Sequence, residues 1–206
     1  DFVTKRYQKA KNILLDDFEE RIKRATPDIC ENLMIISEDE KLLKQTIDKG
    51  ESKKIEFKES LSLDVRQTEN NSSYKPKKEN YIELSVLKTI AGFLNSDGGE
   101  LFIGVNDESK VFGIDTELKI FHKSSKDKMQ LHLKTIIKEN IGLSSSNFIN
   151  SELKKVSGKE IIHITCRKSD EAVYIKDKDF YIRSGPSTDK LEGRELVKYT
   201  SSRFKS

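Results

Sequence analysis

Apolar residues recur along most of this chain at the spacings expected for the buried faces of helices and strands. Apolar positions three or four residues apart indicate amphipathic helices, whereas alternating apolar and polar positions indicate half-buried strands. Helices are predicted on this basis for residues 1–25, 37–49, 81–94, 126–140 and 192–204. Strands are predicted for residues 51–60, 101–105, 111–114, 148–156, 160–166, 172–175 and 180–183.

The segment 91–107 combines a helix end, a turn and a strand. The helix ends at Asn95, a polar turn with two glycines follows at 96–99, and residues 101–105 are almost wholly apolar. A strand that is apolar on both faces usually lies in the centre of a covered sheet. Asp107, just beyond this strand, is therefore expected to be rigidly held and still reach solvent.

The order of elements predicts an α+β fold, in which a mixed, mainly antiparallel sheet is layered with helices. A change of composition at Gly50 divides the chain into a helical segment, 1–49, and a domain, 50–206. We interpret the first part as a linker or the tail of an upstream domain. Residues 62–78 are polar and predict a mobile loop. Because the chain begins at Asp1 and not at Met, we expect it to be a piece of a longer polypeptide.

The composition narrows the class of protein. The 206 residues are 34% hydrophobic and 35% charged, which is polar but sufficient for one core. No apolar run approaches the roughly 18 residues of a membrane span, and the start does not resemble a secretory signal, so we expect no membrane partner. Cys30, Cys166 and the three histidines lack the clustered spacing of a zinc site or a disulfide framework. Cys166 is expected to be a buried, reduced thiol, and on this basis we expect a cytoplasmic protein.

The charge is biased toward the end of the chain. The net charge is +3, but from Lys154 onward there are 13 Lys and Arg residues against 8 Asp and Glu. Such an excess suits a polyanionic partner. A solvated, lysine-rich surface explains the same count.

Three acids, Glu51, Glu56 and Asp107, are candidates for a site. Glu56 and Lys58 lie on the predicted exposed face of the strand 51–60, but Glu51 is five residues away, or about 16 Å along an extended chain. The acids converge only if the chain turns back near Gly50. In that case three carboxylates would suit Mg²⁺ or Mn²⁺, with Lys58 offsetting the charge of a phosphate. On spacing alone, solvated surface acids are the simpler interpretation.

Two turns also carry groups that suit a phosphate. The glycines in 96–99 would let backbone N–H groups approach a phosphate, although a plain helix-to-strand turn is the simpler interpretation. Arg183 ends a predicted strand and precedes a turn that carries the hydroxyl groups of Ser184, Ser187 and Thr188. An arginine beside hydroxyl groups suits contact with a nucleic-acid backbone.

Three motifs, in this order, resemble the Schlafen-type, Alba-like nucleic-acid-binding domain, above all its bacterial and archaeal members. They read ESKKIEFKES, VLKTIAGFLNSDGGELFIGVNDESKVFGI and FYIRSGPSTDKL. The LDVR segment and the terminal LVKYTSSRF are also similar, so the resemblance covers residues 50–204. It implies the fold of one Alba-like lobe.

The resemblance also implies a site. In animal Schlafen endoribonucleases, which act on transfer and ribosomal RNA, the catalytic acids match Glu51, Glu56 and Asp107, and Lys58 falls in the same motif. Two departures are evident: the Schlafen nuclease core has two lobes and a zinc-binding Cys/His cluster, whereas this chain has one lobe and no such cluster. A homodimer would restore a two-lobed groove. The same acids also occur in members assigned only to DNA binding or transcriptional regulation.

The sequence therefore predicts a nucleic-acid-binding domain, with RNA favoured over DNA. The sharper hypothesis is a metal-dependent endoribonuclease for structured RNA such as tRNA. Glu51, Glu56 and Asp107 would hold Mg²⁺ or Mn²⁺, and the phosphate backbone would be held by Lys58, Arg183, Ser184, Ser187 and Thr188. The alternative is a non-catalytic DNA-binding or regulatory module of a larger defence or transcription protein. A nucleotide-binding module ranks last, because the chain has no GxxxxGK[ST] phosphate loop.

Overall fold

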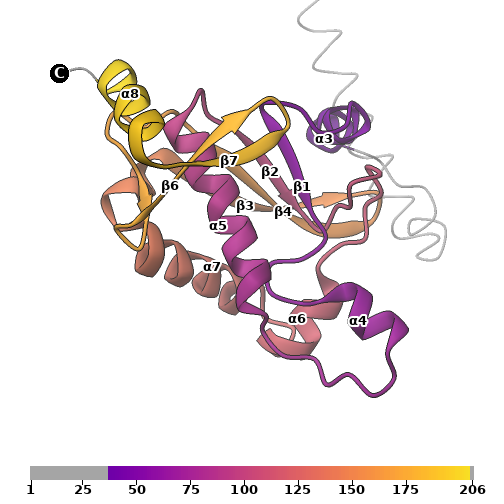
Figure 1. The fold of residues 1–206 in the computed structure, drawn as a ribbon. Helices are drawn as coiled ribbons and strands as arrows, with labels where there is room; N and C mark the ends of the chain where they lie inside the picture. The colour runs from indigo at the N-terminus through magenta and orange to yellow at the C-terminus, as the bar shows by residue number, and fades with distance from the viewer. Residues whose placement is uncertain (1–36, 205–206) are drawn as a thin grey trace, which may run out of the picture. The chain divides into compact units, whose positions relative to one another are not determined.

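The computed structural model describes residues 37–204 (Figure 1). The predicted helix 1–25 and Cys30 lie outside these residues. The helices are α3 (Glu38–Asp48), α4 (Val65–Asn70), α5 (Asn80–Asn95), α6 (Asp115–His122), α7 (Lys126–Ile141) and α8 (Gly193–Arg203), with a 3₁₀ turn η1 (Ser144–Phe148). The strands are β1 (Ile55–Lys58), β2 (Gly99–Ile103), β3 (Ile149–Val156), β4 (Lys159–Cys166), β5 (Tyr174–Ile175), β6 (Asp179–Ser184) and β7 (Ser187–Leu191).

The larger sheet has four strands in the order β1-β2-β4-β3. The β1–β2 pair is parallel, whereas β2–β4 and β3–β4 are antiparallel. The predicted α+β fold with a mixed, mainly antiparallel sheet is therefore confirmed. β2 lies inside the sheet, and Leu101, Phe102 and Ile103 are fully buried, which confirms the prediction of a central strand.

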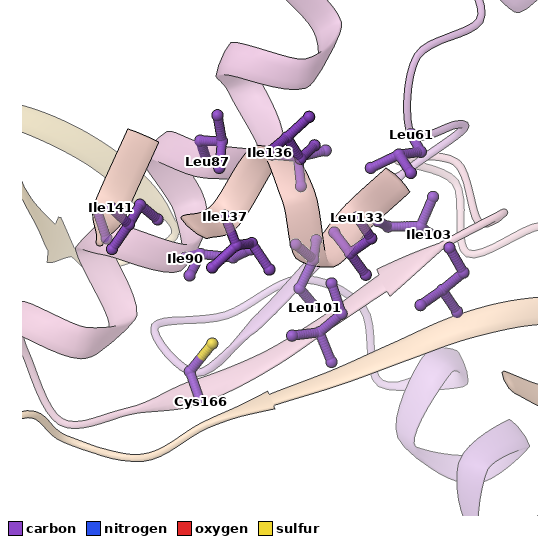
Figure 2. Packing of buried hydrophobic residues seen from close by; sticks show 14 of the residues in the cluster. Leu61, Leu87, Ile90, Leu101, Ile103, Leu133, Ile136, Ile137, Ile141 and Cys166 are labelled. Atoms are coloured by element: carbon purple, nitrogen blue, oxygen red, sulfur yellow. The ribbon is translucent and has the colours of Figure 1, made fainter. Parts of the chain in front are cut away.

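Side chains from β2 enter two different apolar clusters, one on each face of the sheet. Leu101 and Ile103 pack with residues of α5 and α7 such as Ile90 and Leu133 (Figure 2). Phe102 belongs to the other cluster, with Phe57, Ile161 and, from α3, Ile47. Because successive side chains of a strand point to opposite faces, only a strand covered on both sides is apolar at consecutive positions.

The helix α3 agrees with the helix predicted for residues 37–49. Its Ile47 is fully buried, and the Glu40 carboxylate accepts a hydrogen bond from Ser157 N at 2.7 Å, in the turn between β3 and β4. The helix therefore covers part of the sheet. The domain boundary placed at Gly50 stays a prediction.

The smaller sheet, β5-β6-β7, is antiparallel and packs against α5. The buried Asn95 side chain joins the two by donating to Val173 O and Tyr181 O, at 2.8 and 2.9 Å, and accepting from Val173 N. Its hydrogen-bonding groups are thus satisfied inside the protein, as burial of an amide requires. The predicted pair of strands, 172–175 and 180–183, is present as β5 and β6.

Four segments differ from the predictions. Residues 62–78 contain α4, and the carboxylate of Asp64, which caps the start of this helix, accepts from Gln67 N at 2.8 Å. No residue of α4 is buried, so hydrophobic periodicity could not identify it. The short helix α6 was not predicted. The turn expected after residue 183 is present at 185–186, but it is shorter than expected because β7, which was not predicted, begins at Ser187. The hairpin expected between 101–105 and 111–114 is reduced to one bridge, Val105 with Val111.

Two further expectations concern the core and the membrane. Cys166 is a free thiol, only 3% exposed, and burial raises its pKa to about 12, as expected for an inert structural cysteine. Across residues 37–204, no helix combines the length and apolarity needed to cross a bilayer.

Candidate functional site

Glu51 is folded back onto β1 by a tight turn. Ser52 and Ile55 form an antiparallel bridge, with Ser52 N donating to Ile55 O at 2.9 Å. A carboxylate oxygen of Glu51 accepts a hydrogen bond from Phe57 N at 3.0 Å. The turn near Gly50, which the sequence allowed but did not establish, is therefore present, and it brings Glu51 beside the middle of β1.

The pKa of Glu51 responds to its burial and to the charges around it. Partial burial raises this pKa above its ordinary value, and the Phe57 N–H opposes the rise. The charges of Glu56 and Asp107 raise it further, whereas Lys58 lowers it. Glu51 therefore lies within range of the charges of Glu56, Asp107 and Lys58.

Glu56 lies between two cations. Lys58 Nζ contacts one carboxylate oxygen, and Arg183 Nη1 donates to the other at 2.8 Å. The Glu56 side chain is only 12% exposed, so its predicted place on an exposed strand face is wrong. It is covered because the end of β6 brings Arg183 over β1.

Arg183 is used inside the protein. Its side chain is 1% exposed, and besides Glu56 its guanidinium donates to Thr188 Oγ1 at 2.9 Å and to Ser52 O at 2.8 Å. It also lies over the Phe93 ring, 4.9 Å from the centroid. The arginine thus fastens the turn at Ser52 and strand β1 to the β6–β7 hairpin. In this arrangement it positions Glu56 and has no exposed surface for a phosphate.

The hydroxyl residues of the β6–β7 hairpin separate into two kinds. Ser184 and Ser187 are exposed at its end, and the Ser187 hydroxyl donates to Ser184 O at 2.9 Å. Thr188 is half-buried and accepts from Arg183. Of the predicted phosphate ligands in this hairpin, only the two serines therefore face solvent.

Asp107 is exposed and lines a surface cleft of about 370 Å³ that Lys58 also lines. The cleft lies beside β1, α4 and the first turns of α5, and its polar and aromatic lining includes Lys58, Asp64, Arg66, Tyr81, Ser85 and Asp107. Arg66 and Tyr81 were not among the site residues predicted from the sequence. The sequence holds a signal for Arg66, which is the last residue of the LDVR segment that resembles the Schlafen-type domain. It holds no such signal for Tyr81.

The three acids suit Mg²⁺ or Mn²⁺ by chemistry, since both ions prefer carboxylate oxygens. Their arrangement gives less support: among residues 37–204, no group of three or more His, Cys, Asp or Glu side chains is placed to hold a metal ion. Both oxygens of Glu56 contact cations, and Glu51 already binds a backbone N–H. A metal at Glu56 would therefore compete with Lys58.

The glycine-bearing turn 96–99 serves packing. Gly98 N donates to Phe93 O at 3.0 Å, so this N–H has a partner within the protein. A Cβ atom at Gly98 would lie 2.5 Å from Cys166 O, and one at Gly99 would lie 2.3 Å from the Phe93 ring. The plain helix-to-strand turn is the arrangement observed.

Comparison with solved structures finds limited similarity. The DIP2311 protein of Corynebacterium diphtheriae is 19% identical, with a TM-score of 0.48 over 73% of this chain and 27% of its own. The N-terminal domain of a putative ATP-dependent DNA helicase RecG-related protein from Nitrosomonas europaea is 18% identical, with a TM-score of 0.36 over 68% of this chain and 83% of its own. The chain thus spans about a quarter of the Corynebacterium protein.

No curated protein matches this chain significantly. The profile of the family described as "Schlafen, AlbA_2" matches residues 51–192, which is more than half of the chain and includes β1, β2 and the β6–β7 hairpin. The chain therefore belongs to the Schlafen, AlbA_2 family.

Proposed function

We propose that this domain binds nucleic acid and, more specifically, that it cleaves RNA in the presence of Mg²⁺ or Mn²⁺. Membership of the Schlafen, AlbA_2 family supports nucleic-acid binding. The finer proposal is supported by the placement of Lys58, which contacts Glu56 and lines one surface cleft with Asp107, and by the charge effect of Glu56 and Asp107 on Glu51.

Every residue of the site has a part in this proposal, and Asp107 has two. Lys58 is partly exposed at the cleft and offsets the charge of an entering phosphate. Asp107 is exposed at the same cleft and accepts the proton of the attacking hydroxyl or water. As the new bond to phosphorus forms, the P–O bond to the leaving ribose oxygen breaks, and solvent water protonates that oxygen. Glu51, Glu56 and Asp107 are the residues that would hold the metal, which when bound supplies a Lewis acid for the phosphate. Arg183 keeps Glu56 in place by its hydrogen bond.

The test uses the purified chain, transfer RNA and Mn²⁺. Glu108→Ala is the matched control for Asp107→Ala, because Glu108 is the adjacent exposed acid and its loss changes the net charge equally. We expect the unaltered chain and Glu108→Ala to cleave RNA and Asp107→Ala to lose at least about a hundredfold in rate, the scale of one general base. Cleavage by neither the unaltered chain nor the control, or equal cleavage by all three, overturns the nuclease proposal.

A non-catalytic DNA-binding or regulatory module, within a larger defence or transcription protein, is the second candidate. The pairing of Glu56 with Lys58 and Arg183 favours it, because the acid is already neutralised without a metal. Steeply salt-dependent binding to DNA, without RNA cleavage, is the expected result for this candidate. Binding that is absent, or insensitive to salt, would remove both candidates.

A homodimer that joins two lobes, and a preference for RNA over DNA, also belong to the proposal. The first is checked by light scattering with and without RNA. The second is checked by competition between RNA and DNA of the same sequence.

A further inference from the structure

The cleft that Asp107 and Lys58 line also displays an aromatic ring. Tyr81, in the first turn of α5, is 59% exposed although its ring is apolar. α4 and the start of α5 are joined by the segment 71–79 (Figure 1), and both elements contribute to the cleft. An exposed ring at a cleft needs an explanation, since burial of a tyrosine ring is normally favourable.

The Tyr81 ring is held in place from one edge. Its hydroxyl donates a hydrogen bond to the Asp64 carboxylate, and the same carboxylate caps α4 by accepting from Gln67 N at 2.8 Å. The hydrogen bond between Tyr81 and Asp64 raises the pKa of Tyr81 to about 12 and lowers that of Asp64. At neutral pH the tyrosine hydroxyl is therefore the donor and the carboxylate the acceptor. The ring is thus oriented before anything binds, while much of its surface stays in water.

Charge and apolar surface are arranged around this ring. Buried Phe57 and Leu63 line the cleft, whereas Lys58 and Arg66 bring positive charge to it. Glu59, Asp64 and Asp107 line it as well. Because three acids and two cations line the cleft, and Lys58 also contacts Glu56, the cleft can offset the charge of one phosphate at most.

A flat ring beside two cations matches one nucleotide. Bases stack on aromatic side chains whatever their sequence, and the neighbouring phosphate is held by Lys or Arg. The volume, about 370 Å³, falls within the range of small-molecule pockets. A paired base in a duplex has both faces covered by its neighbours, so only an unpaired base offers a face to the ring.

We infer that this cleft binds an unpaired nucleotide of a single-stranded or looped nucleic acid, with its base stacked on Tyr81 and its phosphate beside Lys58 and Arg66. The inference rests on the proposed function and specifies its substrate. It places the adjoining phosphate of the strand near Asp107, which lines the same cleft.

The test measures binding to a short single-stranded RNA that contains one 2-aminopurine, and to a duplex of the same sequence. Tyr81→Ala is expected to weaken binding of the single strand about tenfold, in line with the loss of one base–aromatic stack. Tyr81→Phe keeps the ring and should stay within about threefold of the unaltered chain. Tyr74→Ala is the matched control, because Tyr74 also donates its hydroxyl to an acid, Glu79, at 2.8 Å, but does not line the cleft.

Stacking is also visible without any variant. Binding to the unaltered chain should quench the 2-aminopurine fluorescence, and duplex affinity should be the same for Tyr81→Ala as for the unaltered chain. Arg66→Ala should lower the slope of log affinity against log salt by about one.

The outcomes separate the inference from the function on which it rests. Salt-dependent binding of single strands that does not quench 2-aminopurine, or that Tyr81→Ala leaves unchanged, overturns the inference and leaves the proposed function standing. If the unaltered chain binds no nucleic acid at all, the proposed function fails, and the inference fails with it.

Discussion

Replacing Arg183 by Met tests whether this arginine positions the site or contacts the substrate. Methionine keeps a long apolar side chain next to Phe93 but removes every hydrogen bond of the guanidinium. Glu56 then retains Lys58 as a partner, and Ser52 O and Thr188 Oγ1 lose a donor.

The cost follows from burial. The Arg183 side chain is 1% exposed and that of Glu56 is 12%, and breaking a buried ion pair by removing one partner costs about 3–5 kcal/mol. For a domain of this size, each kcal/mol lowers the melting temperature by about 2–4 °C, so we expect a decrease of roughly 10 °C. Nucleic-acid binding by the folded protein should keep its dependence on salt, since no phosphate contact is lost.

Thermal unfolding followed by circular dichroism, and binding assays at several salt concentrations below the melting range, measure both effects. Lys190→Met is the control, because Lys190 lies in the same hairpin and pairs with Asp179 at 2.9 Å at the surface. The melting temperature of the Lys190→Met protein should barely change. A stable Arg183→Met protein whose binding has become weaker and less salt-dependent would refute the positioning role and indicate direct phosphate contact.

Two further predictions concern stability. Burial raises the pKa of Glu117 from 4.5 in the unfolded chain to about 7 in the folded protein. Protonation of Glu117 therefore stabilises the folded state, fully below pH 4.5, and this contribution is lost as the pH rises through 7. His122 has the opposite effect on the pH dependence of stability. Burial lowers its pKa from 6.5 to about 4, so the folded state loses stability as the pH falls from 6.5 to 4. Glu117→Gln should therefore lose roughly 3 kcal/mol more than the unaltered chain between pH 7.5 and 4.5 in urea unfolding, and parallel pH profiles would contradict this. Gly99→Ala should cost about 1–3 kcal/mol in the same assay, because the added Cβ would lie 2.3 Å from the Phe93 ring and 2.8 Å from Lys54 O, and an unchanged unfolding midpoint would show that the turn relaxes freely.

The helices and strands of the core were predictable because their patterns are local. Leu133, Ile136 and Ile137 recur at helical spacing in α7, and all three are buried in one cluster. α4 shows the limit of this method, since a helix without a buried residue leaves no apolar stripe to detect.

The candidate site was less predictable, because its geometry depends on contacts between distant residues. Glu51 reaches β1 only through the turn at Ser52, which alternation of side chains cannot reveal. Arg183 has the sequence context of an exposed strand end, yet it bonds to Glu56 across 127 positions of the chain. Tyr81 and Asp64 are 17 residues apart, and their contact defines one wall of a cleft that no local pattern indicates.

By itself, the sequence determined the α+β class, the central strand with its following acid and the family resemblance, since hydrophobic periodicity and motifs are properties of short segments. The tertiary structure alone decided which polar side chains face solvent and which face each other. Sheet pairing and hairpin packing turned Arg183 inward, covered Glu56 and left Asp107, Lys58 and Tyr81 around one cleft. The physical reason is that burial of a polar group depends on what packs over it, and those groups lie far away along the chain.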